Sequence, residues 1–219
     1  MKVPKLSQQN AYAKVAARCY KLAQPLRRSA RGRLPVDEQR HASAAKDEVM
    51  TAFIALLRAV NVGGTGKLPM ADLKAICEQQ GFGKVRTYIA SGNVVFESTQ
   101  PERAIKAALE AALHEYAGKN VGVLVRTAAE MQQVLAANPF AKMAPNRTVA
   151  YFLDKPPPAD TLRAITGAVE EEVRLGKREI YVHYGDGMAR SKLKIPAAEA
   201  GTARNMNTIA KLAEMAAAL

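Results

Sequence analysis

The stretch VRTYIASGNVVF, residues 85–96, decides the fold. Its two runs, 85–90 and 94–96, are rich in β-branched and aromatic residues, which is typical of strands. Gly92-Asn93 between them favours a two-residue hairpin turn with glycine at the first central position. We therefore expect an antiparallel hairpin at this point of the chain.

A helix and a further strand are predicted on each side of this hairpin. The apolar runs 53–60 and 121–125 indicate buried strands. Residues 69–81 and 101–118 each begin at a proline, end at a glycine and carry apolar residues at helical spacing. The order βαββαβ is that of the split-βαβ, ferredoxin-like arrangement, in which both helices cover one face of a four-stranded antiparallel sheet. Residues 51–126 suffice to build such a subdomain.

The rest of the chain, residues 127–219, predicts a second, smaller α+β subdomain. Thr127 is a suitable cap for a helix that ends near Asn138-Pro139. Further helices are expected after Pro156-Pro157-Pro158, through Leu162, Ile165 and Val169, and over 206–216; strands are expected at 149–153, 171–175 and 180–184. The fold class predicted for the whole chain is therefore α+β.

The charge of the protein is concentrated near its N-terminus. The 219 residues carry a net charge of +12, with a sequence pI near 9.8, which suggests an anionic partner. Residues 1–49 contain eleven basic and four acidic side chains, a net charge of +7, and leave +5 for the rest. This basic extension is expected to be partly helical or disordered, and is either a nucleic-acid-binding arm or a solvated segment. An anionic ligand must therefore be argued from placed residues of the main body.

Composition excludes several classes of protein. A hydrophobic content of 48% is that of a globular protein, so a collagen-like or wholly disordered chain is excluded. Two cysteines and three histidines without ligand spacing predict no metal site, and no cofactor is expected. The low cysteine content favours a reducing, cytoplasmic compartment. No apolar run reaches the roughly 20 residues of a membrane helix, so no membrane partner is expected, and no secretory signal is recognised.

The glycine-rich segment NVGGTGK, residues 61–67, is the first candidate binding element. It fails the P-loop pattern at both ends, because Asn61 stands at the first glycine position and Leu68 follows Lys67. Its backbone N–H groups and Lys67 would still suit an anion just before a helix. The alternative is a flexible connection between a strand and a helix.

The segment TARNMNT, residues 202–208, crowds five polar side chains immediately before the last helix or within its first turn. Thr and Asn there can cap the helix, but one cap suffices. Arg204 near a helix N-terminus opposes the helix dipole unless it faces an anion or pairs with an acid. Arginine and asparagine beside free N–H groups suit an anion site. The alternative is ordinary capping with a surface arginine.

Four separate motifs, in order, resemble those of the bacterial domain-of-unknown-function family number 1697: FIALLRAVNVGG (53–64), MADL (70–73), TYIASGNVVF (87–96) and TARNMNT (202–208). The resemblance spans about residues 51–219 and leaves 1–49 outside it. It implies a cytoplasmic bacterial protein with two α+β subdomains, the first ferredoxin-like, and brings no established activity or cofactor. One departure is Met206, where the family often has an aromatic residue.

Three functions remain open from these observations. The first is a protein that binds a phosphate-bearing ligand, a nucleotide or a nucleic acid, in a polar basic cleft. Its candidate residues lie at strand ends, turns and a helix start, where functional groups concentrate. These candidates are Arg58, Asn61, Lys67, Ser91, Asn93, Lys192, Arg204 and Asn205. The alternatives are an enzyme for a small anionic substrate, for which no nucleophile–base pair is recognised, and a non-catalytic interaction protein of undetermined oligomeric state.

Overall fold

The computed structural model describes residues 49–61 and 67–219, which belong to one compact unit. The expectations for the basic extension up to residue 48, and for the glycine-rich residues 62–66, lie outside the described part of the chain.

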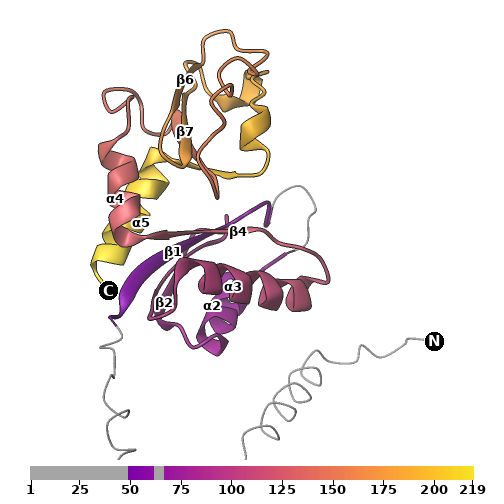
Figure 1. Ribbon diagram of the computed structural model, residues 1–219, viewed down its shortest axis with the longest axis vertical. Coiled ribbons are helices and arrows are strands. Elements are labelled where there is room, and N and C mark those ends of the chain that lie inside the picture. Colours follow the sequence, from indigo (N-terminus) through magenta and orange to yellow (C-terminus); the bar gives the residue numbers. More distant parts are fainter. Residues whose placement is uncertain (1–48, 62–66) are drawn as a thin grey trace, which may run out of the picture. The chain divides into compact units, whose positions relative to one another are not determined.

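The first half contains the predicted order of elements (Figure 1), and every strand pairing in its sheet is antiparallel. The elements are β1 (Thr51–Leu57), α2 (Met70–Gln79), β2 (Gly83–Tyr88), β3 (Asn93–Ser98), α3 (Glu102–Ala117) and β4 (Val123–Thr127). The strand order in the sheet is β2-β3-β1-β4, so β1 lies between β3 and β4. The βαββαβ order predicted for residues 51–126 is therefore present.

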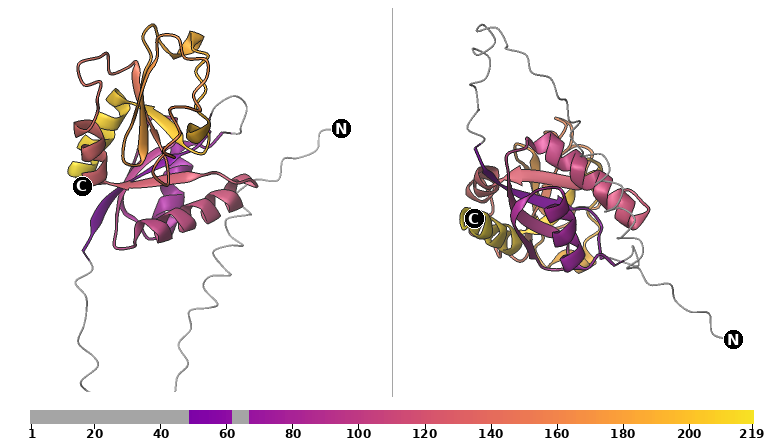
Figure 2. Two further views of the ribbon diagram at one scale, coloured as in Figure 1. Left: turned by 45° about the horizontal axis from the view of Figure 1, so that its top comes forward. Right: turned by 90° about the horizontal axis from the view of Figure 1, so that it is seen from below.

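Helices α2 and α3 cover one face of this sheet (Figure 2). Their buried residues follow the helical period; they are Leu73, Ile76 and Cys77 in α2, and Ile105, Leu109 and Leu113 in α3. These side chains pack on alternate residues of the strands, such as Phe53 and Phe96. The rings of Phe82 and Phe96 stack with centroids 4.4 Å apart. Burial of each large apolar side chain contributes about 1.5–3 kcal/mol, so this core stabilises the whole βαββαβ arrangement.

The second half forms another antiparallel sheet with two helices. Its elements are α4 (Ala128–Ala136), β5 (Thr148–Phe152), β6 (Glu172–Leu175), β7 (Glu179–His183), the short 3-10 helices η2 (Met188–Arg190) and η3 (Pro196–Ala198), β8 (Thr202–Asn205) and α5 (Met206–Ala217). The strand order is β6-β7-β5-β8. Helix α4 begins as predicted, because Thr127 Oγ1 accepts a hydrogen bond from Glu130 N at 3.1 Å, and Glu130 Oε2 accepts one from Thr127 N at 3.0 Å. The α+β class is confirmed.

The other face of the first sheet carries a second core that both halves share. Ile54 and Leu56 of β1, which alternate with Phe53 and Ala55, belong to one cluster with residues of α4, α5 and the second sheet. Phe152 and Tyr181 are the largest buried side chains that the second sheet contributes to this cluster. The first sheet is therefore covered by apolar groups on both faces.

The helix expected after the three prolines is wrong. Residues 158–164 form successive turns, with bonds from Thr161 N to Pro158 O and from Arg163 N to Asp160 O. Val169, expected on the buried face, is 86% exposed. Thr166 instead pairs with Lys194 through two backbone hydrogen bonds of 3.1 and 2.8 Å. This long-range pairing outweighs a short helical pattern whose apolar residues, Leu162 and Val169 among them, remain exposed because they find no surface to cover.

The two-residue turn expected at Gly92-Asn93 is also wrong. Tyr88 and Asn93 are direct partners in the register of β2 and β3, so the loop comprises Ile89 to Gly92. Asn93 is the first residue of β3 and is fully buried. Its side chain faces the loop and closes it by hydrogen bonds. Gly92 adopts a left-handed backbone with φ of 76°.

Candidate functional site

Arg204 lies in a buried hydrogen-bond network between the two sheets. Residues 202–205 form β8, a strand that the sequence did not predict, and Asn205 caps α5 by accepting from Thr208 N at 2.9 Å. Arg204 therefore stands one residue before the helix cap, on a strand, and is 8% exposed. The sequence left open whether Arg204 faces an anion, pairs with an acid or lies on the surface. In the structure its guanidinium instead bonds to neighbouring groups of the protein.

All five N–H donors of Arg204 have acceptors. Nε donates to Asn93 Oδ1; Nη1 donates to Thr202 Oγ1 and Ala203 O, both at 2.8 Å; and Nη2 donates to Leu57 O at 3.0 Å and Ser91 O at 2.9 Å. Burial lowers the pKa of this guanidinium to about 10, because the charged form loses its hydration. Since no carboxylate is among these acceptors, neutral oxygens alone stabilise the charge. No donor remains for a ligand.

Asn93 connects this arginine to the loop between β2 and β3. Its Oδ1 accepts from Arg204, and its Nδ2 donates to Tyr88 O and to Ser91 Oγ, each at 3.0 Å. The side-chain amide thus bridges the two ends of the loop. Asn93 and Ser91 act as positioning groups for residues 89–92.

Asn61 and Arg58 hold the neighbouring loop after β1. Asn61 Nδ2 donates to Leu68 O at 2.9 Å and to Ala90 O at 2.8 Å, and its Oδ1 accepts from Leu68 N at 2.8 Å. Arg58 donates from Nε to Gly201 O at 3.0 Å and from Nη2 to Glu199 O at 2.6 Å. The segments 58–61 and 89–92, which we call the double loop, are therefore joined to each other and to the residues before β8.

Of the four non-glycine residues with a positive φ in the described part of the chain, three lie in the double loop and the fourth lies in β2. Ala59, Asn61 and Ile89 have φ angles of 47°, 56° and 49°, in the left-handed region that non-glycine residues rarely occupy. For the β-branched Ile89, which is 48% exposed, this conformation is a clear outlier. Each such residue costs about 1–3 kcal/mol and persists only where its surroundings impose it, and such residues concentrate at functional sites. The bonds of Asn61, Asn93 and Arg204 impose it here.

The remaining candidates are less closely connected. Lys67 is exposed and immediately precedes Leu68, the residue bonded by Asn61. Asn205 serves as the cap of α5, and Lys192 is exposed on the segment that pairs with Thr166. Ser91, Asn93 and Arg204 thus share hydrogen bonds, and Asn61 bonds the same loop at Ala90 O. Arg58 bonds the segment before β8 instead, Lys67 adjoins Leu68, and Lys192 makes no hydrogen bond to any of these residues in the described part of the chain.

A second charged cluster, which no sequence pattern predicted, joins α3, α4 and the turn between β6 and β7. Arg178 donates to Glu102 at 2.8 Å and to Glu130 at 2.7 Å. Arg126, 1% exposed, donates from Nε to Glu179 Oε1 at 3.4 Å. Burial and then the charge of Arg178 lower the pKa of Arg126. The only signal in the sequence was an arginine within the apolar strand VLVRT, at residues 123–127.

Nucleophilic and metal-binding groups are sparse in the described part of the chain. Cys77 is buried, and burial followed by the nearby charge of Glu78 raises the pKa of its thiol to about 12, so it is a poor nucleophile. His183 is also buried, with Nδ1 2.9 Å from Thr148 Oγ1. Over residues 49–61 and 67–219 no three His, Cys, Asp or Glu side chains come together in a way that would hold a metal ion. Within those same ranges, no helix has the length and apolarity needed to cross a bilayer.

Comparison with known proteins agrees with the motifs quoted above. A family model described as "Protein of unknown function (DUF1697)" matches residues 50–181. The chain belongs to this family. The motif 202–208, which contains Arg204, lies beyond the matched residues. Comparison with curated proteins found no match.

A solved structure supports the fold. The conserved bacterial protein SP0830 from Streptococcus pneumoniae is similar to this chain with a TM-score of 0.66 and 24% sequence identity. The match covers 77% of this chain and 99% of the other. The similarity shows that the two proteins share their fold.

Proposed function

We propose that this protein binds a phosphate-bearing ligand, a nucleotide or a nucleic acid, at the double loop. The observation that carries the proposal is the strained backbone at Ala59, Asn61 and Ile89, held in place by the hydrogen bonds of Asn61 and of the buried pair Asn93 and Arg204. Strain of this kind opposes folding, so its retention at two adjoining loops favours a binding role. The cytoplasmic location and bacterial origin expected from the sequence are part of the proposal.

Arg58 and Lys67 are the groups assigned to the phosphate. Arg58 is half-buried, and its Nη1 has no acceptor among the described residues. Lys67 is exposed and also has no partner among them. It stands three residues before α2, whose N-terminus has no side-chain cap, and the helix dipole favours negative charge at that end. A cation beside a helix N-terminus is a suitable environment for a phosphate.

Arg204, Asn93 and Asn61 act as positioning residues in this proposal. Their polar atoms bond to the protein, so they give the double loop its shape without contacting the ligand. If the protein converts a substrate that contains phosphate, the alternative function of an enzyme holds. If it binds no phosphate compound, the alternative function of an interaction protein holds.

The test compares Lys67→Gln with Lys74→Gln in the full chain. Both lysines are exposed, and both changes remove one positive charge, but Lys74 lies on α2 with Glu78 at 3.7 Å. Binding of ATP and of a short single-stranded oligonucleotide is titrated at several salt concentrations. Because the basic extension is unchanged in both variants, its non-specific binding cancels in the comparison.

We expect Lys67→Gln to weaken binding several-fold and to reduce the slope of log K against log salt by about one, as loss of one phosphate contact requires. Lys74→Gln should leave both quantities unchanged. Equal effects of the two variants would overturn the proposal. If Lys67→Gln weakens binding of the oligonucleotide alone, the ligand is a nucleic acid. If it weakens binding of both the oligonucleotide and ATP, the unit recognised is the nucleotide.

A further inference from the structure

A pocket of about 190 Å³ lies between α4 and the turn that joins β6 to β7. Arg126 of β4 forms part of its wall, with Glu130 and Gln133 of α4 on one side and Lys177 and Glu179 on the other. It belongs to the second charged cluster, so an inference about it does not rest on the double loop.

The acidic groups of the pocket are already satisfied. Glu130 Oε1 accepts from Arg178 at 2.7 Å, and its Oε2 accepts from the backbone and hydroxyl of Thr127 at 3.0 and 3.2 Å. Glu179 Oε1 accepts from Arg126 at 3.4 Å, and its Oε2 accepts from Arg178 N at 3.0 Å. Neither carboxylate therefore needs a further donor from a ligand.

The donors of the pocket are not all satisfied. Arg126 has five N–H groups, and four have acceptors: Glu179 for Nε, Val125 O for Nη1, and Leu153 O and Arg178 O for Nη2. The second N–H of Nη1 has no acceptor in the described part of the chain. The side chains of Lys177 and Gln133, both exposed, likewise have no hydrogen-bond partner among the described residues. The pocket thus has an excess of donors, and its lining contains three cations and two carboxylates.

The volume of the pocket and the apolar part of its lining limit the size and the chemistry of the ligand. Val134, Ala137 and Tyr181 contribute apolar surface. A cavity of about 150 Å³ accommodates a benzene-sized molecule, whereas sites for drug-sized ligands begin at about 300 Å³. The pocket therefore suits a molecule of a few heavy atoms with an anionic end and a short apolar end.

We propose that this pocket binds a small carboxylate with a short apolar tail, its oxygens accepting from Arg126 and Lys177 and its tail lying against Val134 and Tyr181. An arginine and a lysine are the usual partners of a carboxylate in a partly buried site. The lowered pKa of Arg126 is consistent with this site, since burial and Arg178 both disfavour its charge and a bound anion would offset them.

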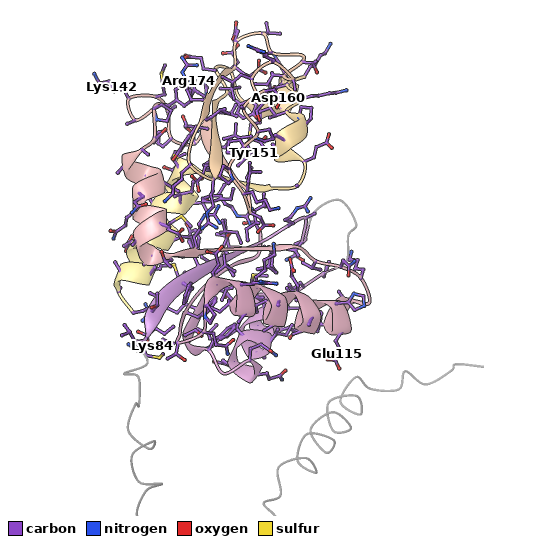
Figure 3. The ribbon with its side chains drawn as sticks, viewed as in Figure 1. Lys84, Glu115, Lys142, Tyr151, Asp160 and Arg174 are labelled. Atoms are coloured by element: carbon purple, nitrogen blue, oxygen red, sulfur yellow. The ribbon has the colours of Figure 1, made fainter. Side chains whose placement is uncertain are left out.

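The test uses butanoate as the probe, with butanamide as its uncharged counterpart, and the full chain labelled for amide chemical-shift titration. The variant is Lys177→Gln, because Arg126 makes four bonds within the fold and its removal would disturb the structure. Lys142→Gln is the matched control: Lys142 is an exposed lysine on the loop after α4 and does not line the pocket (Figure 3). Gln133→Ala is a second pocket variant without a change of charge.

We expect butanoate to shift the amide signals of residues 126, 133 and 177, and to bind at least tenfold more tightly than butanamide. Lys177→Gln should weaken butanoate binding about fivefold, the loss of one exposed charge pair, and Lys142→Gln should leave it unchanged. Equal binding of butanoate and butanamide, or equal effects of the two lysine variants, would overturn the proposal. Tighter binding of inorganic phosphate than of butanoate at the same signals would refute the carboxylate assignment. Each of these results is independent of ATP binding at the double loop.

Discussion

Arg204 of β8 donates its Nε hydrogen to Oδ1 of Asn93 in β3, so a buried hydrogen bond joins the two sheets across 111 positions of sequence. Nη2 of the same arginine bonds Leu57 O at the end of β1 and Ser91 O in the loop after β2. One side chain of the second sheet therefore positions two segments of the first. The shape of the double loop depends on this contact.

Replacing Asn93 by alanine is expected to lower the free energy of unfolding by about 2–4 kcal/mol, because a buried guanidinium loses an acceptor and the loop loses two bonds. Urea denaturation of the full chain measures this change. Asn120→Ala, at an exposed position, should change stability by less than about 0.5 kcal/mol. A similarly small effect of Asn93→Ala would contradict the role given to the network.

Substitutions at two glycines with similar backbone angles distinguish the cost of a left-handed conformation from the cost of steric overlap. Gly92 and Gly81 have φ angles of 76° and 80°, but a Cβ at Gly92 would lie 2.4 Å from Val60 Cγ2, whereas one at Gly81 would have no atom within 4 Å. We expect Gly81→Ala to cost about 1 kcal/mol and Gly92→Ala about 2–4 kcal/mol in unfolding free energy. Equal losses in thermal or urea unfolding would show that the two segments of the double loop are not closely packed against each other.

Acid should weaken the second charged cluster through Glu130. Burial opposes ionisation of this carboxyl, but the hydrogen bond from Thr127 N and the charge of Arg178 together hold its pKa below the model-compound value of 4.5. The unfolded chain therefore binds a proton at a higher pH than the folded chain. The resulting stabilisation is complete above about pH 4.5 and is lost as pH falls through the lower, folded-state pKa.

Unfolding free energies of Glu130→Gln measured between neutral and acid pH test this prediction. The variant should lose stability at neutral pH and show a shallower decline below pH 4.5 than the unsubstituted protein. The control is Glu115→Gln, at an exposed position of α3 (Figure 3), which should leave the pH profile unchanged. Parallel pH profiles for Glu130→Gln and the unsubstituted protein would disprove the linkage.

Local periodicity accounts for most of the fold that was predicted. Helix α3 carries Ile105, Leu109 and Leu113 on one face and ends before Gly118, which adopts a left-handed φ of 66°. Each of these features is visible within a few residues of sequence. The expected helix through Leu162 and Val169 failed because a short apolar pattern has no stability without a surface to cover, and Thr166 pairs with Lys194 instead.

Most of the polar residues that the sequence singled out lie near one another in the structure, but their contacts were not predicted. Ser91, Asn93 and Arg204 share hydrogen bonds and Asn61 bonds the same loop at Ala90 O, as polar residues at strand ends and turns can do. Arg58 bonds Glu199 O and Gly201 O instead. Sequence could not show that Arg204 is saturated by neutral oxygens, since its acceptors come from residues 57, 91, 93, 202 and 203. The second charged cluster was not predicted for the same reason: its members come from distant segments of the chain.

The sequence by itself determined the family, the α+β class, and the position of each element whose apolar residues repeat at a local period. Only the tertiary structure decided that β8 precedes the last helix, that Asn93 begins a strand instead of ending a turn, and that Arg204 reaches it from the other sheet. The physical reason is the range of the interactions. Helical and strand periods act over a few residues, whereas the burial and pairing of a charged side chain depend on segments more than a hundred residues apart in the sequence.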